Sequence, residues 1–228
     1  NLDQQFFEIF QGLERAHGTF EVKDTTKVKH GGKAQTIKEP YTVRLWTNHL
    51  NGDNGLGVVP INDNNECRFG ALDIDDYNLN LKNLVKKIYE LGIHLFPCRS
   101  KSGGLHVYLF TRDWVPASLM REKLQGIASV LGFGGSEIFP KQNQILSNRG
   151  DVGSWINMPY FNRHDTNRFC YGEDMSKLPS GRFTELVLER RYKKDAFQSI
   201  GAMEGGDITD GPPCLQFLCG QGFPEGTR

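Results

Sequence analysis

The amino-acid sequence predicts an α+β fold whose core is one four-stranded sheet carrying two helices. Between residues 67 and 140, strand and helix patterns follow one another in the order β-α-β-β-α-β, separated by glycine- and proline-containing turns. This is the split βαβ, or ferredoxin-like, arrangement that RRM-like domains also adopt. We expect one domain over 1–200, with the core at about 67–140 and a smaller N-terminal α/β unit at about 1–66.

The composition supports a folded domain and excludes several classes of protein. The 228 residues are 38% hydrophobic and 11% aromatic, which allows a packed core and argues against wholesale disorder. Equal numbers of basic and acidic residues, 27 of each, exclude a nucleic-acid binder that relies on overall positive charge. The sequence has five scattered cysteines, no secretory leader and no apolar run of the roughly 18 residues that a transmembrane helix requires. We therefore expect a cytoplasmic protein without membrane contacts.

The N-terminal unit combines helices with a hairpin. Apolar residues at helical spacing predict an amphipathic helix over 2–16, and alternation predicts a hairpin over 19–38. A short helix over 40–49 and a strand over 55–60 follow. The hairpin carries four lysines, which fit a solvated edge as well as a nucleic-acid contact: Lys23, Lys27, Lys29 and Lys33.

The core elements follow in order. Hydrophobic patterns predict strands over 67–75, 94–100, 105–110 and 136–140, and helices over 79–91 and 116–131. Beyond the core, 154–161 fits a strand and 183–192 fits a helix or a strand. Residues 201–213 read as a linker, and Cys214 begins a further element, so we expect a piece of a longer protein.

Alternation along the strands sorts their side chains onto two faces. In a ferredoxin-like sheet the first strand is central, between the third and the fourth. If Leu72 and Ile74 face the two helices, then Asp73 and Asp75 point to the opposite, helix-free face. By the same reasoning His106 and Glu137 point to that face from the two flanking strands. The neighbouring Asp76 belongs to the helix side.

Two carboxylates two residues apart on a strand lie about 7 Å apart and repel each other unless a cation neutralises them. Such oxygen ligands favour Mg²⁺ or Mn²⁺, and a third carboxylate allows a two-metal site for phosphoryl transfer. We expect Asp73, Asp75 and Glu137 as ligands, with Asp151 as the rival third acid. Taken alone, an Asp-x-Asp pair also fits a solvated strand end.

The segment between the second and third strands resembles an anion-binding turn. Its backbone N–H groups, hydroxyls and cations suit a triphosphate, although an ordinary hairpin turn has the same glycines. The candidate nucleotide-binding residues are Arg99, Ser100, Lys101, Ser102, Gly103 and His106, with Lys141 beyond the last strand.

Aromatic and basic residues alternate further along the chain. The mixture suits contacts with a single-stranded template by stacking and charge, for which Tyr160, Arg163 and Arg168 are the candidates. Core aromatics with solvated arginines are the alternative. The cysteines show no zinc-binding spacing.

Three motifs in order resemble those of the archaeo-eukaryotic primase superfamily: Gly70-Ala71-Leu72-Asp73-Ile74-Asp75, Ser102-Gly103-Gly104-Leu105-His106 and Ser136-Glu137-Ile138. The runs EIFPKQ and GSWINMPY are similar to the prokaryotic branch, including CRISPR-associated primase-polymerases. The resemblance covers roughly 40–170.

The resemblance implies an RRM-like catalytic core with an added α/β unit. It also implies a DNA primase-polymerase that initiates and extends primers from dNTPs or NTPs on single-stranded DNA, using two divalent ions. Its catalytic residues would be Asp73, Asp75, Glu137 and His106, and CRISPR adaptation proteins would be partners of the full-length chain.

Two departures from the family pattern stand out. Many members have serine two residues before the histidine, where this chain has Gly104. The tail, 212–228, is similar to the start of a primase C-terminal module, which in some relatives binds an iron–sulfur cluster. Its two cysteines are too few for a four-cysteine cluster, so we expect none in this fragment.

Three other functions use the same residues. One is a non-catalytic RRM-like binder of single strands, although acids at the centre of the binding face disfavour it. A metal-dependent nuclease and a nucleotide cyclase are the others. The nuclease would shorten labelled DNA, and the cyclase would consume nucleotide without a template.

Overall fold

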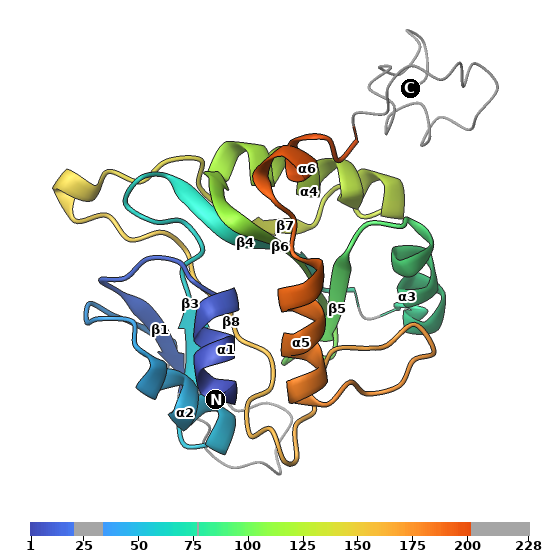
Figure 1. The fold of residues 1–228 in the computed structure, drawn as a ribbon, viewed down its shortest axis with the longest axis horizontal. Coiled ribbons are helices and arrows are strands. Elements are labelled where there is room, and N and C mark those ends of the chain that lie inside the picture. The colour runs from blue at the N-terminus through green and yellow to red at the C-terminus, as the bar shows by residue number, and fades with distance from the viewer. Residues whose placement is uncertain (21–33, 77, 202–228) are drawn as a thin grey trace, which may run out of the picture.

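The computed structural model describes residues 1–20, 34–76 and 78–201, which fold into two four-stranded antiparallel sheets with helices around them (Figure 1). We call them the core sheet, ordered β5-β6-β4-β7, and the N-terminal sheet, ordered β2-β1-β3-β8. The chain belongs to the α+β class that the sequence predicts.

The core sheet has the predicted ferredoxin-like order, with its first strand between the third and the fourth. Its elements are β4 (Glu66–Ile74), α3 (Leu81–Glu90), β5 (Leu95–Arg99), β6 (Leu105–Pro116), α4 (Ala117–Leu131) and β7 (Glu137–Phe139). β6 is longer than the predicted strand at 105–110 because its second half continues beside the start of β4, where Cys67 pairs with Val115.

Helix α4 covers the face of β4 that carries Gly70, Leu72 and Ile74. A β-carbon on Gly70 would lie 2.6 Å from Met120 Cγ and 2.7 Å from a Leu124 methyl, so the helix approaches the strand backbone closely. Leu72 and Ile74 are buried. The alternation predicted for β4 is therefore correct on its helix side.

The opposite face is not helix-free, which corrects the prediction. Helices α1 (Leu2–Ile9) and α5 (Ser180–Arg190) lie side by side over it in Figure 1. Phe10, just after α1, packs its ring 5.1–5.3 Å from those of Phe69, Tyr108 and Phe110. Phe183 of α5 packs 5.8 Å from Phe96. Sequence alternation identifies this face correctly, but it contains no signal for the helices that close half of it.

The N-terminal sheet is assembled from distant parts of the chain. It contains β1 (His17–Phe20), β2 (Ala34–Ile37), β3 (Gly55–Val58) and β8 (Ile156–Asn157), and α2 (Val43–Asn51) packs against it. The predicted hairpin is present, with His17 opposite Ile37, but its four lysines lie outside the described residues. Because β8 comes after the core in the sequence, this sheet takes one strand from outside the predicted N-terminal unit at about 1–66.

The remaining elements are short or were left open by the sequence. The segment 183–192 is mostly helical, as part of α5, while the short helices η1 (Ser147–Arg149) and α6 (Lys194–Gln198) were not predicted. The predicted linker and C-terminal module fall on 201–228, of which all but Gly201 lie outside the described residues. Across the described ranges, no helix has the length and apolar character needed to cross a bilayer.

Candidate active site

The site begins with a row of three side chains on adjacent strands. Asp73 of β4 stands directly opposite His106 of β6 on one side and opposite Glu137 of β7 on the other. Residues directly opposite in antiparallel strands share a face. The structure therefore brings together the acid–histidine–acid set that alternation predicts, at the end of the face that α1 and α5 leave uncovered.

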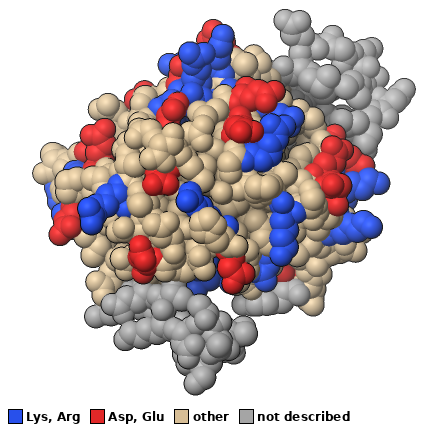
Figure 2. Space-filling view, turned by 60° about the horizontal axis from the view of Figure 1, so that its bottom comes forward, with Lys and Arg blue, Asp and Glu red and all other residues tan. Residues whose placement is uncertain are grey.

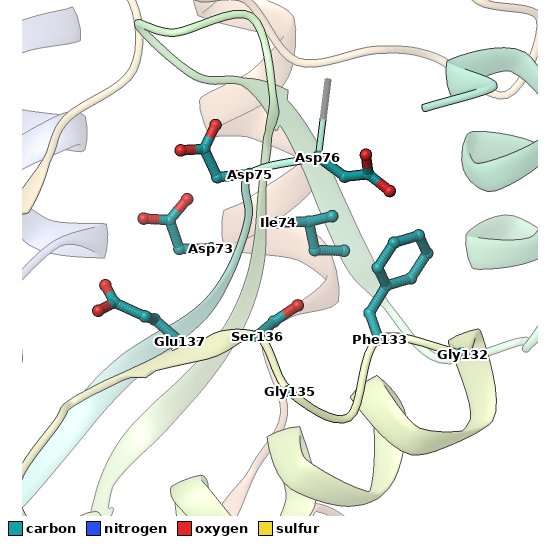
Figure 3. A pocket seen from close by; sticks show the side chains of 9 residues that line it. All are labelled: Asp73, Ile74, Asp75, Asp76, Gly132, Phe133, Gly135, Ser136 and Glu137. Atoms are coloured by element: carbon teal, nitrogen blue, oxygen red, sulfur yellow. The ribbon is translucent and has the colours of Figure 1, made fainter. Parts of the chain in front are cut away.

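Figure 3 shows how the neighbouring acids divide. The side chains of Asp73, Asp75 and Glu137 extend to the same side, while Asp76 extends to the other, toward Phe133. All four line the borders of an open hollow of about 390 Å³ beside the end of β4. The three acids of one side are the candidate ligands, and Asp76 is a natural internal comparison.

Each candidate acid meets a polar partner in the protein. His106 Nε2 lies 3.4 Å from Asp73 Oδ1, the Ser102 hydroxyl donates to Asp75 Oδ1 at 3.2 Å, and Lys141 Nζ lies 3.0 Å from Glu137 Oε2. Glu137 and Lys141 are both well exposed, so their ion pair is weak. These partners supply part of the positive charge and hydrogen bonding that a cation would provide.

Across the described residues, no three His, Cys, Asp or Glu side chains are gathered into a ready-made metal-ligand set. The chemistry of the donors nevertheless fits a hard divalent ion, because three carboxylates project from adjacent positions to one side. Asp151 lies elsewhere: it is exposed, and its carboxylate accepts from Leu146 N at 3.2 Å. The geometry thus favours Glu137 over Asp151 as the third acid.

The turn between β5 and β6 is closed by its own hydrogen bonds. Ser100 N donates to Gly104 O at 3.0 Å, Gly103 N donates to Ser100 O at 3.2 Å, and Gly103 has a φ of +93°. The hydroxyls of Ser100 and Ser102 are 3.1 Å apart. The turn therefore links Asp75 to the buried Ser100.

Gly104 explains one departure from the family pattern. A β-carbon at this position would lie 2.4 Å from Ile74 O, far inside contact distance. Serine cannot occupy the position unless the β4 backbone shifts. Ser102 is instead the hydroxyl that reaches the acids.

Two cations of the site share one aromatic ring. Lys101 Nζ and the Arg168 guanidinium both lie 4.9 Å from the centre of the Phe20 ring, and Arg168 also lies 5.2 Å from that of Phe161. Arg168 is only 7% exposed, and its Nη1 has no hydrogen-bond partner among the described residues. The sequence contained no signal for Phe20, although an aromatic at the end of a strand is a common cation partner.

In the part of the chain that the structure describes, neither of these two cations forms an ion pair with a carboxylate. Burial lowers the pKa of Arg168 to about 10, and burial together with the charge of Arg168 lowers the pKa of Lys101. Arg168 therefore remains cationic at neutral pH. A buried guanidinium without a carboxylate is costly, so this corner favours an anion. Arg99 points elsewhere, donating from Nη1 to Asn167 O at 3.1 Å.

The predicted template contacts do not form one surface. Tyr160 is 1% exposed, and its hydroxyl donates to Leu178 O at 2.8 Å, so its prediction as a template contact is wrong: it is a core residue. Arg163 is half-buried, with Nη1 3.9 Å from Asp3 Oδ1. Arg168 faces inward rather than outward.

A chain of polar contacts joins the two sheets at the site. The Tyr108 hydroxyl lies 3.4 Å from His106 Nδ1 and donates to Asn157 O of β8 at 3.2 Å. Asn157 Oδ1 is buried without a hydrogen-bond partner among the described residues. Sequence reasoning treated 154–161 as a strand and missed Asn157, whose only signal is its place in the GSWINMPY run.

Charged side chains are scattered over the surface that Figure 2 shows. In this view, basic and acidic residues alternate over a mostly uncharged surface, with no broad basic area. This surface therefore has no general positive field that would attract nucleic acid.

The profile of one protein family, described as the archaeo-eukaryotic primase domain of TOTE conflict systems, matches residues 15–178. The chain belongs to this family, which confirms the resemblance at the level of the superfamily. The match gives no support to the CRISPR-associated branch or to CRISPR adaptation partners. A search of curated proteins finds no match.

Membership carries three general statements about this chain. It is a primase-type domain of the nucleotidyl-transfer superfamily, its substrates are nucleotides and nucleic acid, and such domains generally depend on divalent metal ions.

Proposed function

We propose that this chain is a DNA primase-polymerase that starts and extends strands from dNTPs or NTPs on single-stranded DNA. The carrying observation is the row His106–Asp73–Glu137 across three strands, with Asp75 on the same side and the cations Lys101 and Arg168 nearby. Acids for metal ions and cations for phosphates are the two halves of a nucleotidyl-transfer site.

Asp73, Asp75 and Glu137 are the residues that would hold Mg²⁺ or Mn²⁺. When bound there, divalent ions neutralise charge on the attacking and leaving oxygens. Lys141 would exchange its ion pair with Glu137 for a phosphate oxygen, which the exposure of both side chains permits. Ser102 holds the carboxylate of Asp75 in place through its hydroxyl.

Lys101 and Arg168 would bind the triphosphate. Arg168 Nη1 is buried without a hydrogen-bond partner among the described residues, and a charge-assisted hydrogen bond to phosphate is strong in such an environment. Phe20 lies against both cations and fixes their positions. His106 lies between Asp73 and the Tyr108 hydroxyl, and its Nε2 would exchange the contact with Asp73 for a phosphate oxygen when a metal ion takes that carboxylate.

The test is strand synthesis on unprimed single-stranded DNA with dNTPs or NTPs and Mg²⁺ or Mn²⁺. The variants are Asp73→Ala/Asp75→Ala and, as a matched control, Asp76→Ala, which removes a carboxylate from the other side of the same strand end. Synthesis by the native chain and Asp76→Ala alone supports the proposal. If unprimed DNA gives no product, a primed template separates loss of initiation from loss of polymerisation.

Two results would contradict the proposal. Shortening of labelled DNA, abolished by the same double substitution, would identify a nuclease. Metal-independent binding of DNA, with no synthesis on either template, would identify a non-catalytic binder.

A further inference from the structure

Trp155 lies across the backbone of the N-terminal sheet. A β-carbon on Gly18 would be 2.1 Å from the indole Cδ2, and one on Gly57 would be 2.1 Å from Cε3. Gly18 and Gly57 are directly paired on β1 and β3. The indole thus rests on two neighbouring strands at the one place where both lack side chains, and its Nε1 donates to Thr36 Oγ1 of β2 at 3.2 Å.

Residues on both sides of Trp155 in the chain connect it to the acid row. On one side, Ser154 exchanges two hydrogen bonds with Gln142, at 3.0 and 3.1 Å, and Gln142 directly follows Lys141. On the other side, Asn157 O accepts from Tyr108, whose hydroxyl meets His106. The indole is therefore held at the border between the acid row and the open face of the N-terminal sheet.

Part of the indole is available to a ligand. Trp155 packs against the small apolar cluster around Ile61 but is partly exposed, and among the described residues no aromatic ring stacks on it and no cation lies over it. By contrast, the Phe20 ring on the same sheet face is buried and contacts Lys101 and Arg168. The part of this face around Phe20 thus favours anions, whereas the part around Trp155 favours an uncharged, flat group.

Asn157 narrows the chemistry of that group. Its side chain shares the face of Gly57, the residue directly opposite, and its buried Oδ1 has no partner in the described structure. An oxygen acceptor repels a phosphate but can accept from the amino group of a nucleobase. A partly exposed indole, beside an acceptor that has no partner among the described residues, is a combination that recognises a base by stacking and one edge contact.

We propose that Trp155 stacks a base of the single-stranded DNA template, with Gly18 and Gly57 as the floor that positions the indole. This inference rests on the proposed function for the identity of the strand. We assign the base to the template rather than to the incoming nucleotide because the indole extends over β3 and β1 to Thr36, across the sheet, whereas the phosphate-binding cations gather at Phe20.

Equilibrium binding of a fluorescent single-stranded oligonucleotide to the full chain tests the proposal without any catalysis. The variants are Trp155→Ala, Trp155→Leu and Trp155→Phe. Leu keeps apolar bulk over the glycines but cannot stack, and Phe can. Trp114→Leu is the matched control, since Trp114 is a partly exposed indole that contacts Arg68. We expect Ala and Leu to weaken strand binding about tenfold or more, and Phe to restore most of it.

An oligonucleotide with abasic positions sharpens the result. Removing bases should weaken binding to the native chain and to Trp114→Leu, but have little further effect on Trp155→Leu. Nucleotide affinity, measured with a fluorescent dNTP and Mn²⁺ in the absence of DNA, should stay unchanged in every variant.

The proposal is overturned if Trp155→Leu binds strands like the native chain, or if it loses nucleotide affinity instead. Equal losses with Leu and Phe would likewise show that Trp155 acts by packing and not by stacking. Since the readout is binding, a failure of strand synthesis would contradict the proposed function and leave this inference to its own test.

Discussion

The two ends of one sheet face differ sharply. Along β4 and β6, Phe69 is opposite Phe110 at one end, and Asp73 is opposite His106 at the other. The aromatic end is sealed by Phe10 and Phe183, whereas the acid end opens onto solvent. The same alternation of side chains thus places buried aromatics at one end of the face and the candidate active-site residues at the other. The two ends differ because α1 and α5 cover only the aromatic end, and the strand sequences contain no signal for this cover.

The largest effect should come from the covered end. Phe10→Ala removes a ring that contacts Phe69, Tyr108 and Phe110, all buried. We expect the free energy of unfolding to fall by about 3–5 kcal/mol, as for other buried Phe-to-Ala changes. Urea denaturation measures it. Asp73→Asn is the comparison from the open end, and a loss of similar size there would contradict the distinction.

Gly104→Ser tests the crowded turn beside the acids. The new β-carbon meets Ile74 O at 2.4 Å, so the strand must shift. We expect a loss of about 1–3 kcal/mol in unfolding free energy, typical of overpacking. Gly135→Ser, where a β-carbon meets nothing within 4 Å, is the control. A stable Gly104→Ser variant would show that the turn moves freely.

A pH titration tests the buried histidine of α2. His49 Nε2 donates to Pro159 O, and its Nδ1 accepts from Leu56 N, so the ring is held neutral and burial lowers its pKa to about 3. The unfolded chain takes up this proton near its ordinary value of 6.5. Stability is therefore present above that pH and falls as the pH drops toward 3.

Between pH 7 and pH 5 the contribution of His49 amounts to about 2 kcal/mol of lost stability. Urea denaturation at several pH values measures this loss. In His49→Gln, the unfolding free energy should fall by about 2 kcal/mol less between pH 7 and pH 5 than in the native chain. An unchanged slope in the variant would assign the pH dependence to other groups.

The smallest effect on stability is expected at Arg168. Arg168→Met replaces a buried cation, whose Nη1 has no partner in the described part of the chain, by an apolar side chain of similar length. Since the buried charge is itself costly, unfolding free energy should change by less than about 1 kcal/mol. Affinity for inorganic triphosphate should fall about tenfold or more. Calorimetry measures it, with Lys177→Met, a cation over Phe169, as control.

The sequence predicts the core sheet well because each of its strands can be recognised from the hydrophobic pattern of its own few residues. The order of strands, the face of Asp73 and the opposite placement of Asp76 all follow from alternation and turns. The resemblance to the primase superfamily, confirmed by the family match, rests on three motifs within this sheet. The roles assigned to their residues remain predictions.

Long-range packing accounts for what the sequence does not reveal. Tyr160 and Arg168 belong to one aromatic and basic run, yet one is core and the other lies against Phe20, far away in sequence. Trp155 read as an ordinary strand residue, because nothing local connects it to Gly18 and Gly57. Contacts between distant segments determine whether such residues are buried, and hydrophobic periodicity does not reveal these contacts.

The return of β8 to the N-terminal sheet has a consequence for synthesis on the ribosome. Val58 pairs with Ile156, 98 positions later, so β3 keeps an unpaired edge while the whole core is made. At the usual 5–20 residues per second, that edge waits for about 5–20 s. An exposed strand edge is a template for wrong pairing. Chains interrupted before residue 156 should therefore aggregate. We expect a chaperone to bind the nascent protein until β8 has been synthesised.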